Sequence, residues 1–295
     1  MKKTTIIMLL TAVTLGFSSC GEEDDLSPVT IFPTTSLQRD SLDNWLLKNF
    51  TYTYGVDFQY KFQDIESDMK YTLVPADSAL SAKLAIIIKY LWFDAYNEVV
   101  GTDFLKGNVP RQITLIGSPA YNNDGTIVLG TAEGGYKVVL YMVNNLTDET
   151  LKDYDTMNDY YFTTMHHEFM HILNQKKPYN KTFDLISEGE YVSGDWYLRN
   201  TESEALPAGF IRNYAMVEGR EDFAETYSQF VTNSEETWAK KMDLAGKEGK
   251  AIIEEKIQMI RLYLRESWGL DIDALRQAVQ HRAEEIRTLD LEHLN

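Results

Sequence analysis

Two histidines and a glutamate have the types and spacing of a metal-hydrolase site. His167, Glu168 and His171 form the pattern HExxH. Residues i and i+4 of an α-helix lie one turn apart on the same face, so both imidazoles can bind one ion. Glu168 lies beside them, where its carboxylate can take a proton from a water on that ion. The pattern predicts a zinc hydrolase with one Zn2+ per chain.

The local context decides between this prediction and chance. Residues 156–175 predict a helix with Thr156 as its N-cap and an apolar face at helical spacing. A single histidine on such a face is more often a packed core residue, whereas two at i and i+4 favour a metal site. His166 lies outside this register, and we expect it to point elsewhere.

A catalytic zinc site usually has three protein ligands and one open position for water. The metzincin pattern is excluded, because Asn174 and Lys177 stand where that pattern has Gly and His. The remaining downstream histidines, His281 and His293, lie in a charged helix and tail near the C-terminus. We therefore expect the third ligand to be a carboxylate.

Residues 219–230, GREDFAETYSQF, offer two carboxylates at i and i+4. Glu221 and Glu225 can reach one region from a single helix. One of them can bind the metal, while the other accepts the ring N–H of a ligating histidine. Three other carboxylates stay open as third ligands: Glu188, Glu190 and Glu218.

An HExxH motif followed about fifty residues later by ExxxE resembles the gluzincin metallopeptidases. The resemblance implies that Glu221 is the zinc ligand and that Glu225 is the supporting outer carboxylate. Tyr214 resembles the phenol of the anthrax lethal factor type of gluzincin, which implies a catalytic role in stabilising the oxyanion or assisting the leaving amine. The chain has 18 tyrosines, so a packing role for Tyr214 stays open.

The start of the chain resembles a bacterial lipoprotein export sequence. Two lysines precede a short apolar stretch, and two serines then precede Cys20. The resemblance implies that residues 1–19 are a signal peptide, that Cys20 is lipidated, and that the acidic residues 22–25 direct export. We expect a bacterial outer-membrane lipoprotein, exposed on the cell surface, with residues 20–35 as its tether and the lipid as its membrane contact.

Composition excludes some partners. The formal net charge of −17 over 295 residues argues against nucleic acid and against electrostatic binding to anionic lipid. Cys20 is the only cysteine, so no internal disulfide forms and stability depends on the core. With 44% hydrophobic residues, the region 36–295 can form one metallohydrolase domain with subdomains of about 36–176 and 177–295.

The order of the predicted elements favours an α+β fold of the zincin-like metallopeptidase type. Helices are expected over 36–49, over 78–100, and in most of the chain after 218. Strands are expected over 56–62, 112–116, 126–129 and 136–143. This order predicts a mixed or antiparallel sheet with helices in the N-terminal half, a mostly helical C-terminal half, and the metal at their junction.

The predicted sheet also suggests how a peptide would bind. An extended peptide can add to an edge strand, and residues 136–143 or the strand beside them are the candidate. Residues 130–135, GTAEGG, lack the lysine and Ser/Thr of a phosphate loop, so we expect a hairpin turn there.

Over most of its length the chain also resembles a Bacteroidota group of zinc-binding metallopeptidases, the substrate import-associated zinc metallohydrolase lipoproteins. The segments HHEFMHILNQ and EDFAETYS carry the resemblance, with GTAEGG as weaker support. It implies a hydrolase that faces the cell surface or periplasm near an outer-membrane nutrient import complex.

Together these observations predict a monozinc peptidase of the gluzincin type that acts on a peptide or protein substrate, with Glu168 as general base. The alternative is a non-catalytic zinc-containing binding or assembly module of an import complex, which a site closed by four protein ligands would favour. Hydrolysis of an amide or ester in a glycan uses the same metal chemistry and also stays open.

Overall fold

The structure is a computed structural model and describes residues 38–63, 70–121, 127–128, 130–133 and 136–294. The predicted signal peptide, Cys20 and the tether lie outside the described residues, as do the last two glycines of GTAEGG. All elements below belong to the unit Asp40–Asn295. Among its described helices, none combines the length and apolar character needed to cross a bilayer.

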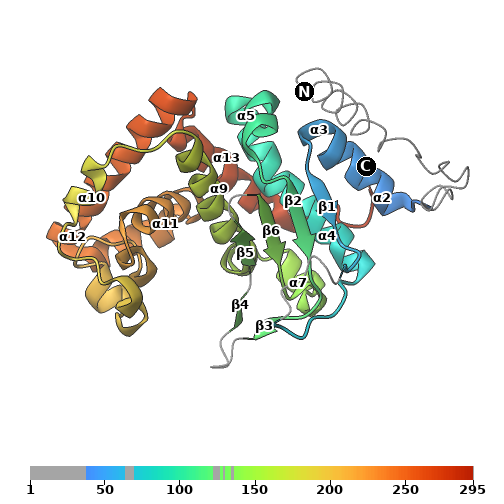
Figure 1. Ribbon diagram of the computed structural model, residues 1–295, viewed down its shortest axis with the longest axis horizontal. Helices are drawn as coiled ribbons and strands as arrows, with labels where there is room; N and C mark the ends of the chain where they lie inside the picture. Colours follow the sequence, from blue (N-terminus) through green and yellow to red (C-terminus); the bar gives the residue numbers. More distant parts are fainter. Residues whose placement is uncertain (1–37, 64–69, 122–126, 129, 134–135, 295) are drawn as a thin grey trace, which may run out of the picture. The chain divides into compact units, whose positions relative to one another are not determined.

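A four-stranded sheet in the order β1-β2-β6-β5 forms the main β part (Figure 1). Its strands are β1 (Asp57–Gln59), β2 (Gln112–Leu115), β5 (Gly130–Glu133) and β6 (Lys137–Leu140). The first three strands in the order run parallel, and β5 pairs antiparallel with β6. Every residue of β2 and β6 is buried, as expected for parallel strands covered on both faces. A separate antiparallel pair consists of β3 (Ala120–Tyr121) and β4 (Ile127–Val128).

The structure bears on two expectations for this sheet. β6, within the predicted strand 136–143, is an interior strand between β2 and β5, so of the two candidates it is the strand beside it, β5, that lies at an edge. Residues 130–133 of GTAEGG form this strand rather than a turn. Small residues have low strand propensity and hide the alternation that marks a strand, whereas backbone pairing with β6 sets the conformation.

Helices form most of the remainder, in agreement with the predicted α+β class. The predicted helix 78–100 is α4 (Ser78–Ile88), a π-helical turn η4 (Lys89–Phe93) and α5 (Asp94–Val100). The other α-helices are α2 (Ser41–Leu46), α3 (Tyr52–Tyr54), α6 (Thr102–Asn108), α7 (Asp148–Leu151), α8 (Tyr154–Met157), α9 (Thr163–Lys176), α10 (Thr182–Ile186), α11 (Gly219–Thr232), α12 (Glu235–Tyr263) and α13 (Ile272–Glu285).

The helix that carries HExxH begins earlier than predicted. Its N-cap is Asp153, in an extended backbone conformation, and Thr156 lies inside the first turn of α8. The Thr156 hydroxyl donates a hydrogen bond to the Asp153 carboxylate, 2.5 Å away. The Thr156 side chain thus bonds to Asp153 and does not cap the helix, and the extended backbone of Asp153 marks the helix start. A π-helical turn, η6 (Asn158–Phe162), then leads into α9.

The described residues form three apolar cores, of which the smallest lies around β3 and β6. The main core joins the sheet to α4, α5, α9, α11 and α13. A second core, including Phe210, Ile211, Ala215 and Met216, packs the loop of residues 205–217 against α12. This loop precedes α11, so the second core fixes the chain just before the predicted carboxylate ligands.

A buried ion pair ties the same loop to α11 and α12. Lys256 Nζ lies 2.7 Å from Asp222 Oδ2, and both side chains have no exposed surface. The ammonium also donates a 2.8 Å hydrogen bond to the Gly209 carbonyl. Gly209 has a φ of +84°, and a Cβ there would lie 2.3 Å from a carbon of Ile252, so the close approach requires glycine.

Replacing Lys256 by Met should lower the free energy of unfolding by about 3–5 kcal/mol, because Asp222 would remain as an unpaired buried charge. Chemical denaturation measures this loss. Lys250→Met on the same helix is the matched control, since Lys250 forms only an exposed 3.8 Å pair with Glu254 and should change stability by about 0.5 kcal/mol or less. Equal stability of the two variants would contradict the structural role assigned to the Lys256 pair.

Candidate metal centre

Helices α9 and α11 pack against each other and bring the predicted ligands together. His167 and His171 project from α9, and Glu221 projects from the first turn of α11. All three side chains are mostly buried. Gly219 at the start of α11 lies close to α10, since a Cβ there would lie 2.2 Å from Asp184 Oδ1.

The three donor atoms converge on one point. His167 Nε2 and His171 Nε2 are 2.9 Å apart, and they lie 3.1 Å and 3.3 Å from Glu221 Oε2. Zinc bonds of about 2.0–2.1 Å in a tetrahedron place ligand atoms about 3.3 Å apart. Two imidazole nitrogens and one carboxylate oxygen are also a donor set that zinc accepts. Both the spacing and the chemistry of these residues fit a zinc ion.

The rival ligands lie elsewhere. Among the described residues, the His, Cys, Asp and Glu group with donor atoms within 4.8 Å of one another consists of His167, His171 and Glu221. Two imidazoles and one carboxylate are the number of protein ligands that catalytic zinc sites use, whereas closed structural sites use four. The other carboxylates and histidines considered above are exposed: Glu188, Glu190, Glu218, His281 and His293.

Carboxylates give the centre a negative electrostatic potential. Burial alone would lower the pKa of His167, but Glu225 and Glu221 raise this pKa to about 9. Burial acts in the opposite direction on Glu221, yet its hydrogen bonds with the two histidines hold its pKa well below the ordinary range. A negative field around two adjacent ring nitrogens favours a cation between them.

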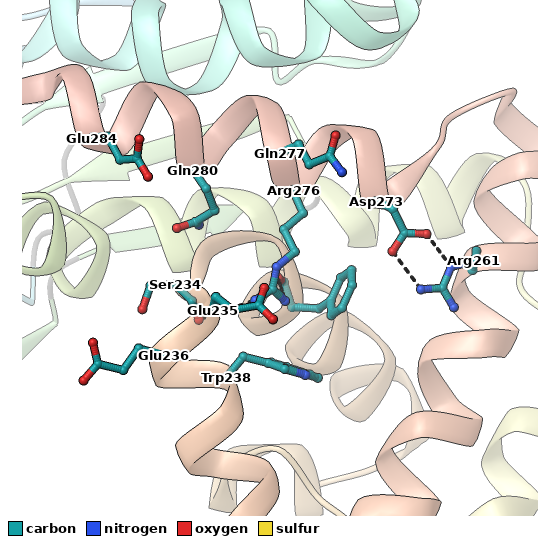
Figure 2. Close-up of a pocket in the computed structure, with 11 residues that line it drawn as sticks. Ser234, Glu235, Glu236, Trp238, Arg261, Asp273, Arg276, Gln277, Gln280 and Glu284 are labelled. Atoms are coloured by element: carbon teal, nitrogen blue, oxygen red, sulfur yellow. Dashed lines mark hydrogen bonds and ion pairs between the residues drawn. The ribbon is translucent and has the colours of Figure 1, made fainter.

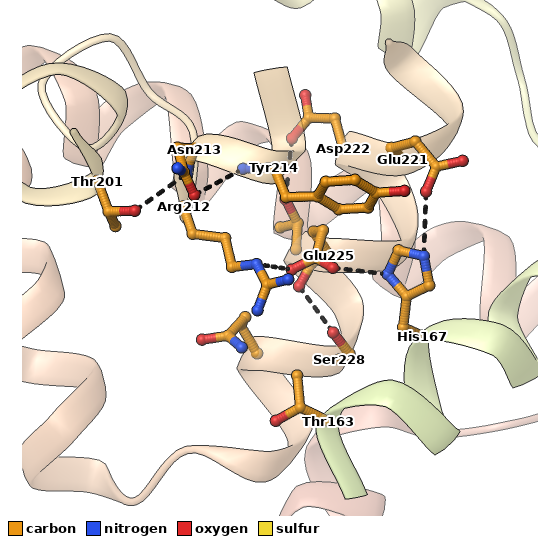
Figure 3. A network of polar contacts seen from close by, with 12 residues as sticks. Thr163, His167, Thr201, Arg212, Asn213, Tyr214, Glu221, Asp222, Glu225 and Ser228 are labelled. Carbon is orange, nitrogen blue, oxygen red and sulfur yellow. Dashed lines mark hydrogen bonds and ion pairs between the residues drawn. The ribbon is translucent and has the colours of Figure 1, made fainter. Parts of the chain in front are cut away.

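Glu225 supports His167 from the side away from the other ligands. Its Oε1 lies 2.8 Å from His167 Nδ1, and its Oε2 lies 2.7 Å from Arg212 Nε (Figure 3). Burial raises the pKa of Glu225, but Arg212 and His167 outweigh this effect and lower the pKa below its usual value. The ionised carboxylate can therefore accept the Nδ1 proton of His167, which leaves the Nε2 lone pair for a metal. Arg212 is a site residue that the sequence does not reveal, because no spacing rule links it to Glu225.

Glu168 follows His167 on α9 and is only partly buried. Burial raises the pKa of Glu168 above its ordinary value, although the two histidines oppose this rise. A raised carboxyl pKa moves the group toward the range in which it can both accept and return a proton near neutral pH.

Tyr214 lies at the same centre. Its ring centroid is 6.0 Å from that of His167, and Trp196 packs edge-on against it at 4.9 Å. Burial and the nearby carboxylates, Glu221 first among them, raise the pKa of Tyr214 to about 12. The phenol therefore keeps its proton at neutral pH and can donate a hydrogen bond.

His166 points into the core, as expected. Its side chain is fully buried, and burial lowers its pKa to about 3. Its Nδ1 lies 2.8 Å from the hydroxyl of Tyr96, which is in turn 2.6 Å from the hydroxyl of Tyr227. This neutral histidine helps to join α9, α5 and α11 on the side opposite to the metal centre.

A separate surface pocket of about 650 Å3 lies between the end of α11, the start of α12 and α13 (Figure 2). None of the predicted site residues is among those that line it. Arg276 reaches from α13 and donates hydrogen bonds to the carbonyls of Phe230 and Ser234, at 2.8 Å and 3.4 Å. The first bond satisfies a carbonyl at the C-terminal end of α11, and the second reaches the N-cap of α12, so Arg276 joins α13 to the connection between these helices.

Comparison with known proteins agrees with this geometry. A profile of the family described as "Putative zinc-binding metallo-peptidase" matches residues 35–273. The chain belongs to this family. A crystal structure is known for a protein from Bacteroides caccae that is described in the same words. Its sequence is 44% identical to that of the present chain. The match covers 90% of this chain and 100% of the other, with a TM-score of 0.78. A search of curated proteins found no match.

These findings confirm the predicted family and the α+β fold of a metallopeptidase. The ligand and catalytic roles of the individual residues stay predictions. The positions of these residues in the structure show which atom of each would act.

Proposed function

We propose that the protein is a zinc-dependent peptidase of the gluzincin type. The observation that carries the proposal is the convergence of His167 Nε2, His171 Nε2 and Glu221 Oε2, with Glu168 next to them on α9. These three residues would hold the ion and leave its fourth position for water and substrate. A bound zinc ion would supply a Lewis acid that lowers the pKa of water to about 7 and polarises a carbonyl.

The side chains supply the proton transfers. Glu168 would accept a proton from the attacking water and return it to the leaving nitrogen, which its raised pKa supports. Tyr214 would donate its phenolic hydrogen bond to the oxygen that gains negative charge.

The sheet suggests how a peptide would be aligned with these groups. β5 is one of the two edge strands of the four-stranded sheet, with β1 at the other edge, and it lies against α9 (Figure 1). A substrate in extended conformation would add to β5 through main-chain hydrogen bonds, which would place its backbone beside the helix that carries Glu168. A peptide has a main chain that can pair with an edge strand and a glycan does not, so the edge position of β5 favours a peptide over a glycan amide or ester.

A peptide-library digest tests the proposal. The purified protein should cleave internal or terminal bonds of a mixed peptide library, a chelator should abolish cleavage, and added Zn2+ should restore it. Mass spectrometry of the products identifies the bonds. Zinc-loaded protein that leaves all peptides intact would instead support the binding or assembly module.

We also propose a location and partners from the first 25 residues. The apolar stretch before Cys20 and the acidic residues after it support a lipid-anchored protein on the outer membrane, exposed at the cell surface near an import complex. Mass spectrometry of the protein from its native cells should find an acylated Cys20 as the first residue. A chain that keeps residues 1–19 would contradict the anchor.

A further inference from the structure

The loop before α11 presents Arg212 to the metal centre from a fixed backbone. Phe210, Ile211, Ala215 and Met216 are buried on either side of Arg212. Next to it, the Asn213 side chain donates a 3.1 Å hydrogen bond to the Arg199 carbonyl, and the Asn213 backbone N–H donates to Thr201 Oγ1 at 3.2 Å (Figure 3). Arg212 therefore extends from a segment that is anchored by both apolar packing and hydrogen bonds.

Arg212 is the outer end of a linear series of contacts. Its Nε lies 2.7 Å from one oxygen of Glu225, and the other oxygen of Glu225 lies 2.8 Å from His167 Nδ1. His167 Nε2 then faces Glu221 and His171. The Arg212 side chain is partly exposed, whereas that of Glu225 is almost completely buried.

The two oxygens of Glu225 thus have one partner each. A buried carboxylate needs compensating charge, which the guanidinium of Arg212 supplies through the 2.7 Å contact of its Nε with Oε2 of Glu225. By holding one oxygen, Arg212 fixes the plane of the carboxylate and so the direction of the other oxygen toward His167. The two histidines differ in this respect among the described residues, since His167 has carboxylate contacts with both Glu221 and Glu225, whereas His171 has one with Glu221.

We infer that Arg212 is a positioning residue of the metal centre, which orients His167 for the metal by holding Glu225. The inference rests on the proposed zinc site. It adds the guanidinium of Arg212 to the residues that support this site, next to Glu225. Arg212 contacts Glu225 at 2.7 Å, while its guanidinium also lies 5.7 Å from the centre of the Tyr214 ring. The test must therefore separate an effect through Glu225 from one through Tyr214.

A thermodynamic cycle on zinc affinity tests this dependence. Competition with a chromogenic chelator gives the zinc dissociation constant of the full protein, of Arg212→Met, of Glu225→Gln and of the double variant. Loss of a supporting partner of a metal-binding histidine weakens metal affinity by about 10- to 100-fold, so we expect this range for Glu225→Gln and about 10-fold for Arg212→Met. In the Glu225→Gln background, Arg212→Met should have no further effect.

Two further variants serve as a conservative replacement and as a control. Arg212→Lys keeps the charge but not the planar fork, and should recover part of the affinity. Arg199→Met is the matched control, because Arg199 is an exposed arginine whose side chain pairs with Glu204, and it should bind zinc like the wild type.

The outcomes separate the inference from the function on which it rests. Wild-type affinity in Arg212→Met, or an equal loss in both backgrounds, would overturn the positioning role, since a general loosening of the loop would persist without Glu225. No zinc binding by the wild type would overturn the metal centre itself.

Discussion

Glu168→Gln is expected to keep zinc bound, while its rate of peptide hydrolysis falls by a factor of about 10² to 10⁴. The amide has nearly the shape of the carboxylate but cannot take a proton from water. Glu168 is not among the three converging donors, so its replacement should leave the metal in place. Initial rates of peptide cleavage, measured beside zinc content, give the two quantities for the variant and the wild type.

Glu188→Gln is the matched control for this variant. Glu188 is an exposed glutamate in the chain between α9 and α11, and it is not part of the converging group. It should keep both the activity and the zinc. Substantial hydrolysis by Glu168→Gln would show that another group takes the proton, and zinc loss in that variant would place Glu168 among the ligands.

His171→Ala should abolish tight zinc binding and, with it, the stabilisation that zinc gives to the folded chain. Zinc at a thousand times its dissociation constant stabilises a folded protein by about 4 kcal/mol. For a domain of this size, that stabilisation raises the melting temperature by roughly 10 °C. Scanning calorimetry with zinc and with a chelator should show this difference in the wild type and none in His171→Ala.

His281→Ala provides the comparison, because His281 is exposed on α13 and lies outside the converging group. It should keep the full zinc-dependent shift. A wild-type rise in melting temperature with zinc in His171→Ala would mean that the ion binds without this imidazole and that the assigned ligand set is wrong.

The sequence was sufficient for features that depend on local spacing. HExxH places two imidazoles on one face of a helix, and the i, i+4 spacing of Glu221 and Glu225 does the same for their carboxylates. The predicted helix 78–100 also follows from a local apolar pattern.

Features that depend on tertiary pairing were not accessible in this way. β5 contains small residues with little strand signal, and only its pairing with β6 makes it the edge strand. The contact of Arg212 with Glu225 joins an irregular loop to a helix, so no periodicity predicts it. The buried pair of Lys256 and Asp222 likewise joins residues that are far apart in sequence.

The most direct test of the central claim is the zinc content of the purified protein by elemental analysis, with the wild type beside Glu221→Ala. The geometry of the three donor atoms predicts about one zinc per wild-type chain and almost none in the variant. A wild type without zinc under metal-replete conditions, or equal zinc in the two proteins, would contradict the assignment of His167, His171 and Glu221 as the metal ligands.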